Sequence, residues 1–354
     1  MPMPGTRPLI ICPCCGNPLD TSGGAAGFKW LCNRHGLLSL PGVGGSRPVC
    51  YACQSEHKTL HSIYADTAAC NALQYGGDKG CGCVFPADIL NPEIRKIRIS
   101  FAGPAGSGKT ALIHSIIKEL KGKGSAAYFY REMFISDDVK EQPHNGMAYL
   151  NPYYASFIDG RGQKNILVMY DFLGRDFDEK GEGNSQLLKT AASSDCVFIV
   201  SDAAMFIGKN SEQHNKMAEL RFAFENLLRF MYRHSENTQK MPMLANIFSK
   251  TDTAEVQQEI SRLYSLPGMA DYDKLLKHLV ISASPELHIM FDTDYIKQKR
   301  SFAVSSIGEE EHIAKSGKNQ NIEHLFKVLD PIYWVIDGQL ALGKQENTNS
   351  GRGM

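Results

Sequence analysis

The chain has 354 residues, 43% of them apolar, and its 38 Lys and Arg side chains are balanced by 38 Asp and Glu side chains. This length allows one large domain with a small module, or two ordinary domains, and the balanced charge excludes the molecule-wide basic field of many nucleic-acid and anionic-membrane binders. No apolar run approaches the roughly eighteen residues of a membrane span, and residues 1–11 lack a signal-peptide pattern, so we expect a cytoplasmic protein without a membrane span.

Residues 1–92 form a predicted cysteine-rich module that holds nine of the ten cysteines. In a reducing compartment, clustered cysteines bind metal more often than they form disulfides. Four close pairs could supply ligands: Cys12 with Cys15, Cys32 with His35, Cys50 with Cys53, and Cys81 with Cys83. Two such pairs complete a tetrahedral Zn²⁺ site and leave no position for a catalytic water, so we expect two structural zinc ions.

The pairing of these ligands stays open at this point. Sequential pairing closes shorter loops than a cross-brace arrangement, but the difference in loop entropy is only about 1 kcal/mol. Cys14 could replace a member of the first pair, and Cys70, His57 or His61 could enter the second site. Residues 1–90 carry six Lys or Arg side chains against five acidic ones, so we expect the module to dock proteins rather than nucleic acid.

From Ile94 onward, short apolar runs alternate with helical patterns, which is typical of a mainly parallel sheet with helices on both faces. Predicted strands cover Ile97–Phe101, Ala126–Tyr130, Asn165–Tyr170, Cys196–Val200, Leu244–Phe248 and His278–Ile281. Predicted helices cover Ala111–Leu120, Glu212–Tyr232, Ala254–Tyr264 and Ile322–Ile336. We therefore expect an α/β domain over residues 93–342, after the zinc module, and a disordered tail over residues 343–354.

The sharpest motif in this domain is the run GPAGSGKT at Gly103–Thr110. It matches the phosphate-loop pattern fully, follows a predicted strand and opens a predicted helix, so its N–H groups can point at phosphate oxygens. Lys109 is expected to reach the outer phosphates, and the Thr110 hydroxyl to ligate Mg²⁺. The residues expected to bind the phosphates are Gly103, Gly106, Ser107, Gly108, Lys109 and Thr110.

A second motif, DFLG at Asp171–Gly174, follows the predicted strand Asn165–Tyr170. In a nucleotide-binding sheet, a carboxylate at this place holds Mg²⁺, often through water, and the glycine N–H can sense the terminal phosphate. We therefore expect Asp171 and Gly174 to act on the γ-phosphate and its metal ion.

The residue after this motif is Arg175, where many GTPases have a water-orienting Gln. An arginine cannot accept a proton from water, although it can stabilise developing phosphate charge. Residues 137–162 are the candidate for a first switch loop, in which a Thr normally contacts Mg²⁺ and the γ-phosphate. No Thr lies between Ala127 and Asp171, and Ser136 and Ser156 are weak substitutes. We expect slow intrinsic hydrolysis, on the order of 10⁻⁴–10⁻³ s⁻¹, with a partner supplying the missing group.

A third motif, SKTD, follows the apolar run Leu244–Phe248 and consists of Ser249, Lys250, Thr251 and Asp252. In GTPases, an Asp at this place accepts hydrogen bonds from the guanine ring N–H and amino group, while the Lys stem covers the base. Adenine lacks that pair of donors, and an unpaired charged acceptor costs about 1.5–3 kcal/mol, so guanine is preferred. After the next predicted strand, Ser282 and Ala283 could offer a backbone N–H to the guanine carbonyl.

Two further polar groups fall outside these motifs. The segment after Ala283 contains His288, Asp292 and Asp294, for which a metal or catalytic role is the less favoured interpretation. The charged run Lys297–Arg300 is expected to be solvated.

Across residues 97–337, the order of these motifs resembles the translation-factor and Ras-like class of P-loop GTPases. With the cysteine-rich region in front, the chain is similar to the bacterial double-GTPase family, whose members are associated with conflict or defence systems. The resemblance implies a P-loop fold that binds GTP and GDP with Mg²⁺ and switches with protein partners, such as a second GTPase or an effector. Two alternatives stay open: a P-loop ATPase or kinase-like protein, and a zinc-stabilised scaffold that binds nucleotide without turnover.

Overall fold

The computed structural model describes residues 93–122, 152–158, 163–172, 190–207, 211–238, 240–265, 272–305 and 328–339, with short strands elsewhere and the single residues Ile89, Asn91 and Leu188. The chain divides into two compact units. The first unit contains residues 1–97 and 125–168, and the second contains residues 98–124 and 169–354. The tail expected over residues 343–354 lies outside the described part.

The amino-terminal residues of the first unit form small antiparallel sheets. A four-stranded sheet has the order β4-β3-β5-β8, and two-stranded sheets pair β1 with β2 and β6 with β7. The bounds are β1 (Ile10–Ile11), β2 (Pro18–Leu19), β3 (Phe28–Cys32), β4 (Leu38–Ser39), β5 (Asp66–Cys70), β6 (Leu73–Gln74), β7 (Gly77–Gly80) and β8 (Val84–Pro86). Further along the chain, β10 (Tyr128–Phe129) pairs antiparallel with β11 (Tyr153–Ile158).

The main sheet is mixed and mostly parallel, with seven strands in the order β10-β11-β12-β9-β13-β14-β15. Its remaining strands are β9 (Arg95–Ala102), β12 (Lys164–Asp171), β13 (Cys196–Asp202), β14 (Met243–Ser249) and β15 (Lys299–Ala303). Strand β13 runs parallel to β9 and β14, and β15 runs parallel to β14. Strands β12, β13 and β14 are buried along almost their whole length, as expected for strands covered on both faces. The expected α/β class is thereby confirmed.

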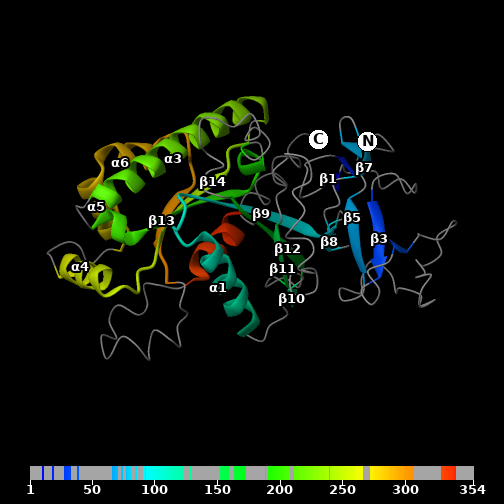
Figure 1. Ribbon diagram of the computed structural model, residues 1–354, viewed down its shortest axis with the longest axis horizontal. Coiled ribbons are helices and arrows are strands. Elements are labelled where there is room, and N and C mark those ends of the chain that lie inside the picture. Colours follow the sequence, from blue (N-terminus) through cyan, green and yellow to red (C-terminus); the bar gives the residue numbers. More distant parts are fainter. Residues whose placement is uncertain are drawn as a thin grey trace, which may run out of the picture. The chain divides into compact units, whose positions relative to one another are not determined.

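Helices of the second unit cover both faces of β13, β14 and β15. The bounds are α1 (Lys109–Gly122), the 3₁₀ turn η5 (Ala203–Phe206), α3 (Ser211–Thr238), α4 (Ala254–Tyr264), α5 (Tyr272–Ala283), α6 (Pro285–Phe291) and a helix at 330–339. Figure 1 shows α1 and the red helix 330–339 on one side of these strands, and α3, α5 and α6 on the other. Phe302 packs on Trp334 of helix 330–339, with ring centroids 5.7 Å apart, and Phe224 of α3 packs on Phe291 of α6 at 4.6 Å.

Most of the predicted elements are confirmed. Four predicted strands lie inside β9, β12, β13 and β14, and Tyr128–Phe129 forms the described part of the strand predicted at residues 126–130. The first two predicted helices lie inside α1 and α3, and the third coincides with α4. The late helix, predicted from Ile322, is described only at 330–339.

One predicted strand is wrong, and two further segments contain or lead into strands that were not predicted. The strand expected at His278–Ile281 is the last part of α5, because the buried residues Leu275, Leu276, Leu279 and Val280 recur at helical spacing. In the charged run Lys297–Arg300, Lys297 and Arg300 are exposed as expected, although the run leads into β15, a strand that was not predicted and whose first two residues are Lys299 and Arg300. The loop expected at 137–162 contains strand β11.

The start of β13 is held by a buried carboxylate. Asp195 is 6% exposed, and its Oδ2 accepts a 2.8 Å hydrogen bond from the Arg98 backbone N–H, while its Oδ1 lies 2.7 Å from Lys240 Nζ. The backbone of Asp195 also bonds to Arg98 on β9 and to Met243 on β14. This one residue therefore joins the start of β13 to both neighbouring strands, β9 and β14.

We expect Asp195→Ala to lower the free energy of unfolding by about 1–3 kcal/mol, because the Arg98 N–H and the Lys240 ammonium lose a shared acceptor. Urea titration followed by circular dichroism measures the change. Asp294→Ala, at an exposed site, is the control and should change stability by less than about 0.5 kcal/mol. Equal effects of the two substitutions would contradict this assignment.

Candidate functional site

The turn between β9 and α1, residues 103–108, is called the glycine loop below. Its three glycines all have positive φ: 149° at Gly103, 73° at Gly106 and 88° at Gly108. A Cβ on Gly103 would lie 2.1 Å from the Val200 carbonyl oxygen, so the backbone of β13 occupies the place of a side chain. The loop therefore needs glycine at this position for both conformation and space.

Lys109 is the first residue of α1 and is 7% exposed. Its Nζ donates to the carbonyl oxygens of Gly103 at 2.9 Å and Pro104 at 2.8 Å. The ammonium is thus fixed against the first two residues of the glycine loop, at the amino end of a helix. Both the lysine charge and the partial positive charge of the helix end favour an anion at this place.

Thr110, in the first turn of α1, lies next to Asp171, the last residue of β12. The Thr110 hydroxyl donates a hydrogen bond to Asp171 Oδ2, although the residues are 61 positions apart. The Phe172 N–H donates to the Phe101 carbonyl at 3.1 Å, which fixes the end of β12 beside the end of β9. Asp171 Oδ1 is buried and has no hydrogen-bond partner among the described residues. An oxygen acceptor of this kind is suited to Mg²⁺, which binds carboxylate and hydroxyl oxygens together with substrate phosphates.

Ser249, the last residue of β14, ties that strand to the glycine loop. It is 1% exposed, and its Oγ lies 2.5 Å from the Ser107 carbonyl oxygen and 3.0 Å from the Ser201 carbonyl oxygen. A hydroxyl has one proton, so the two carbonyls share a single donor. The first residue of the SKTD motif therefore positions the glycine loop from behind.

Lys250 follows in a left-handed backbone conformation, with φ 56°. Its Nζ lies 2.8 Å from Asp202 Oδ2, and Asp202 Oδ1 accepts from the Ala204 N–H at 3.0 Å. A Cβ on Gly108 would lie 3.8 Å from Lys250 Cε, so the lysine stem passes next to the glycine loop. A non-glycine residue in this conformation costs on the order of 1 kcal/mol and is common at binding sites.

Asp252 lies in the turn before α4, where the Thr253 N–H donates to the Lys250 carbonyl at 3.4 Å. Asp252 Oδ1 is buried and has no hydrogen-bond partner among the described residues. The neighbouring Thr251 is fully buried. A carboxylate oxygen held in this way is an acceptor for a ligand that carries N–H donors.

No family model matches this chain, and no curated protein matches it.

The structure brings together most of the predicted site. The described phosphate-loop residues, Asp171 and the SKTD motif all lie at the carboxyl ends of β9, β12 and β14. Ser282 and Ala283 do not join them, because they are the last two residues of α5, where Ser282 is exposed and lies 3.4 Å from His278 Nε2. The strand end expected at these two residues is thus wrong.

Two residues of this sheet edge were missed from the sequence. Asp202 ends the apolar run of β13 just as Asp171 ends β12, and this shared pattern could have identified it. Ser305 follows β15 and is 1% exposed, while the preceding Val304 N–H donates to the Phe248 carbonyl at 2.8 Å. Ser305 therefore occupies the strand-end position that Ser282 and Ala283 were expected to fill.

Several predicted residues lie outside the described part of the chain. These are Gly174, Arg175, Cys12, Cys15, His35, Cys50, Cys53, Cys81 and Cys83, whereas the backbone of Cys32 ends β3. Within the described ranges, no group of three or more His, Cys, Asp or Glu side chains could hold a metal ion. In the same part of the chain, no helix is long and apolar enough to cross a membrane.

Proposed function

We propose that this chain is a GTP-binding switch protein with a P-loop nucleotide domain and slow, partner-assisted hydrolysis. One observation carries the proposal: three separate sequence motifs meet at the carboxyl edge of a mostly parallel sheet. The Thr110–Asp171 hydrogen bond joins the first motif to the second, and the contact of Ser249 with the Ser107 carbonyl joins the first to the third. This edge is where open α/β sheets bind their ligands.

The glycine loop would hold the phosphates, with the Lys109 ammonium and the amino end of α1 supplying positive charge. Thr110 and Asp171 fit a Mg²⁺ ion, because the hydroxyl donates its proton to Asp171 and keeps its lone pairs for the metal, while Asp171 Oδ1 offers a further buried acceptor. A bound Mg²⁺ would neutralise charge on the outer phosphates. The protein residues orient the nucleotide and keep the terminal phosphate at the sheet edge.

Base recognition is assigned to Lys250 and Asp252. Asp252 Oδ1 is a buried acceptor that matches the N–H donors of guanine, and the Lys250 stem is held beside the glycine loop by its ion pair with Asp202. An adenine base would leave the Asp252 carboxylate without donors, at a cost of about 1.5–3 kcal/mol.

Asp252→Asn is expected to exchange GTP for xanthosine triphosphate as the preferred ligand. The asparagine amide offers one acceptor and one donor, which match the ring N–H and second carbonyl of xanthine, whereas the guanine amino group would face the amide N–H₂. GTP affinity should fall at least tenfold and xanthosine triphosphate affinity should rise by a similar factor, since one charged hydrogen bond is worth about 1.5–3 kcal/mol. Competition against a fluorescent GTP analogue measures both affinities.

The matched control is Glu255→Gln, which removes an exposed carboxylate in the first turn of α4. This variant should bind GTP as the native protein does. If Asp252→Asn keeps the native order of affinities, Asp252 does not recognise the base and the GTP assignment fails.

Turnover and partner docking belong to the same proposal. With Arg175 after the DFLG motif, phosphate release by the isolated protein is expected on the order of 10⁻⁴–10⁻³ s⁻¹, and a partner protein would raise it. Residues 1–92 would hold two structural Zn²⁺ ions through the four cysteine and histidine pairs and would dock that partner. The partner class implied by the family resemblance is a second GTPase or an effector.

A further inference from the structure

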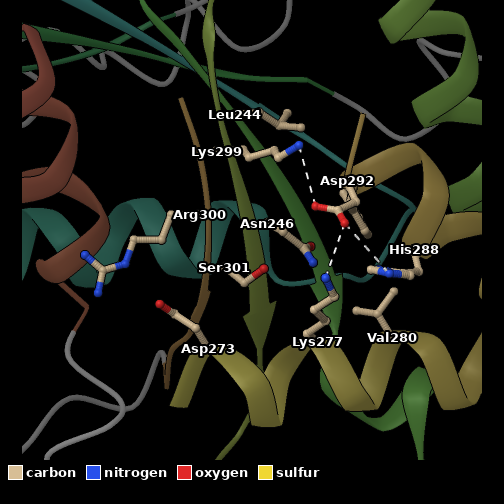
Figure 2. A pocket seen from close by; sticks show the side chains of 11 residues that line it. Leu244, Asn246, Asp273, Lys277, Val280, His288, Asp292, Lys299, Arg300 and Ser301 are labelled. Atoms are coloured by element: carbon tan, nitrogen blue, oxygen red, sulfur yellow. Dashed lines mark hydrogen bonds and ion pairs between the residues drawn. The ribbon is translucent and has the colours of Figure 1, made fainter. Parts of the chain in front are cut away.

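A polar pocket of about 240 Å³ lies between the first half of β14 and β15 and the helices α5 and α6 (Figure 2). Asn246 lines it from β14, three residues before Ser249, which places it about 10 Å from the nucleotide edge along the strand. None of the motifs used for the proposed nucleotide site lines this pocket.

Asn246 is the unusual residue in the pocket. It is 3% exposed in the middle of a buried strand, and neither its Nδ2 nor its Oδ1 has a hydrogen-bond partner among the described residues. Figure 2 shows its amide pointing into the space bordered by Lys277, His288 and Asp292. A buried carboxamide without partners opposes folding, so its donor and acceptor need partners from outside the described residues, such as a bound ligand or ordered water.

The charges around the pocket nearly cancel. Asp292 accepts a 3.2 Å hydrogen bond from Lys277 Nζ and lies 3.6 Å from Lys299 Nζ and 4.0 Å from His288 Nε2. The hydrogen bond from Lys277 lowers the pKa of the Asp292 carboxyl, which is therefore ionised at neutral pH. Asp273 adds a second carboxylate, so two carboxylates face Lys277, Lys299 and Arg300. Figure 2 shows the Arg300 guanidinium directed away from Asn246. With three cations against two carboxylates, the lining has one excess positive charge, which is too little to select a multiply charged ligand.

The other walls suit a flat ring. Leu244, Val280 and Phe291 supply apolar surface, and an aromatic side chain packs well against planar heterocycles. The volume is below the roughly 300–1,000 Å³ of pockets for drug-sized ligands, so the pocket suits a smaller molecule. A carboxamide presents one donor beside one acceptor, the arrangement by which Asn pairs with two adjacent atoms of adenine.

We propose that this pocket binds a small, uncharged heterocycle of nucleobase size, which pairs its own acceptor and donor with Asn246. The site is separate from the proposed nucleotide edge and would let a second ligand act on β14, the strand that ends in the SKTD motif.

The test compares adenine with purine, the same ring system without the amino donor, by ligand-observed NMR on the full chain. Adenine should bind, and purine should bind at least tenfold more weakly, because Asn246 Oδ1 would lose its donor. In Asn246→Leu, which keeps the side-chain shape, the preference for adenine should disappear. Equal binding of adenine by the native protein and Asn246→Leu, or no binding at the solubility limit, overturns the proposal.

Lys109→Ala and Asp252→Asn test whether adenine binds at this pocket or at the nucleotide edge. Neither substitution should change adenine binding, because neither residue lines the pocket. Loss of adenine binding in either variant would assign the ligand to that edge and overturn the second site. The result does not depend on whether the chain binds GTP.

A second measurement reports on the unpaired amide itself. Asn165 is the matched control, because it is 1% exposed and its Nδ2 donates to the Gln163 carbonyl at 2.7 Å. Without added ligand, Asn246→Leu should raise the urea midpoint, whereas Asn165→Leu should lower it. If both substitutions lower the midpoint alike, Asn246 has its partners within the protein and the proposal fails.

Discussion

Lys109→Ala is expected to weaken GTP binding by about a hundredfold or more. The Lys109 ammonium is buried and fixed by the Gly103 and Pro104 carbonyls, so it meets the phosphates without losing further side-chain freedom. Its removal deletes charge-assisted hydrogen bonds worth about 1.5–3 kcal/mol each and leaves two carbonyl oxygens facing the nucleotide. Equilibrium titration with a fluorescent GTP analogue and Mg²⁺ measures the loss.

Lys118→Ala is the control, because Lys118 lies exposed on the same helix. It should leave the affinity unchanged within about twofold, as removal of a distant surface charge does. An unchanged affinity in Lys109→Ala, with the protein folded, would mean that the glycine loop does not bind phosphate.

Gly103→Ala is expected to destabilise the second unit by about 3 kcal/mol or more. Its φ of 149° is accessible almost only to glycine, and the new Cβ would lie 2.1 Å from the Val200 carbonyl oxygen. The side chain can be accommodated only if the backbone of β13 moves away from the glycine loop, which adds a packing cost. Urea titration followed by circular dichroism measures the loss of stability.

Gly106→Ala is the control that separates the cost of the backbone conformation from the cost of the steric clash with β13. Gly106 has a φ of 73°, but a Cβ there meets no atom within 4 Å, so only the backbone conformation is penalised, by about 1–2 kcal/mol. A Gly103→Ala variant as stable as Gly106→Ala would contradict the close approach of β13 to the loop.

The core of the fold could be predicted because its strands are buried on both faces. Strands β12, β13 and β14 read as continuous apolar runs and were found, and α4 was found from its amphipathic period. Strand β15 was not predicted, because it lies at an edge of the main sheet and begins with Lys299 and Arg300. Edge strands carry such charges, which make them resemble a solvated loop.

The sequence alone also identified most of the candidate site, for a physical reason. The glycine loop, Asp171 and the SKTD motif are each local runs that follow an apolar strand, so their chemistry can be recognised without tertiary information. The role of Asp202 depends on its ion pair with Lys250, 48 positions along the chain. Asn246 could not be singled out from the sequence either. Its lack of hydrogen-bond partners depends on how β14 packs against the neighbouring helices and strands.

The most direct test of the central proposal is competition of unlabelled GTP and ATP against a fluorescent GTP analogue with Mg²⁺, using the native chain and Asp252→Ala. The account predicts that GTP competes at least tenfold better than ATP, since adenine leaves the Asp252 carboxylate without donors. This preference should disappear in Asp252→Ala. Equal or better competition by ATP in the native chain would contradict the assignment of a GTP-binding switch.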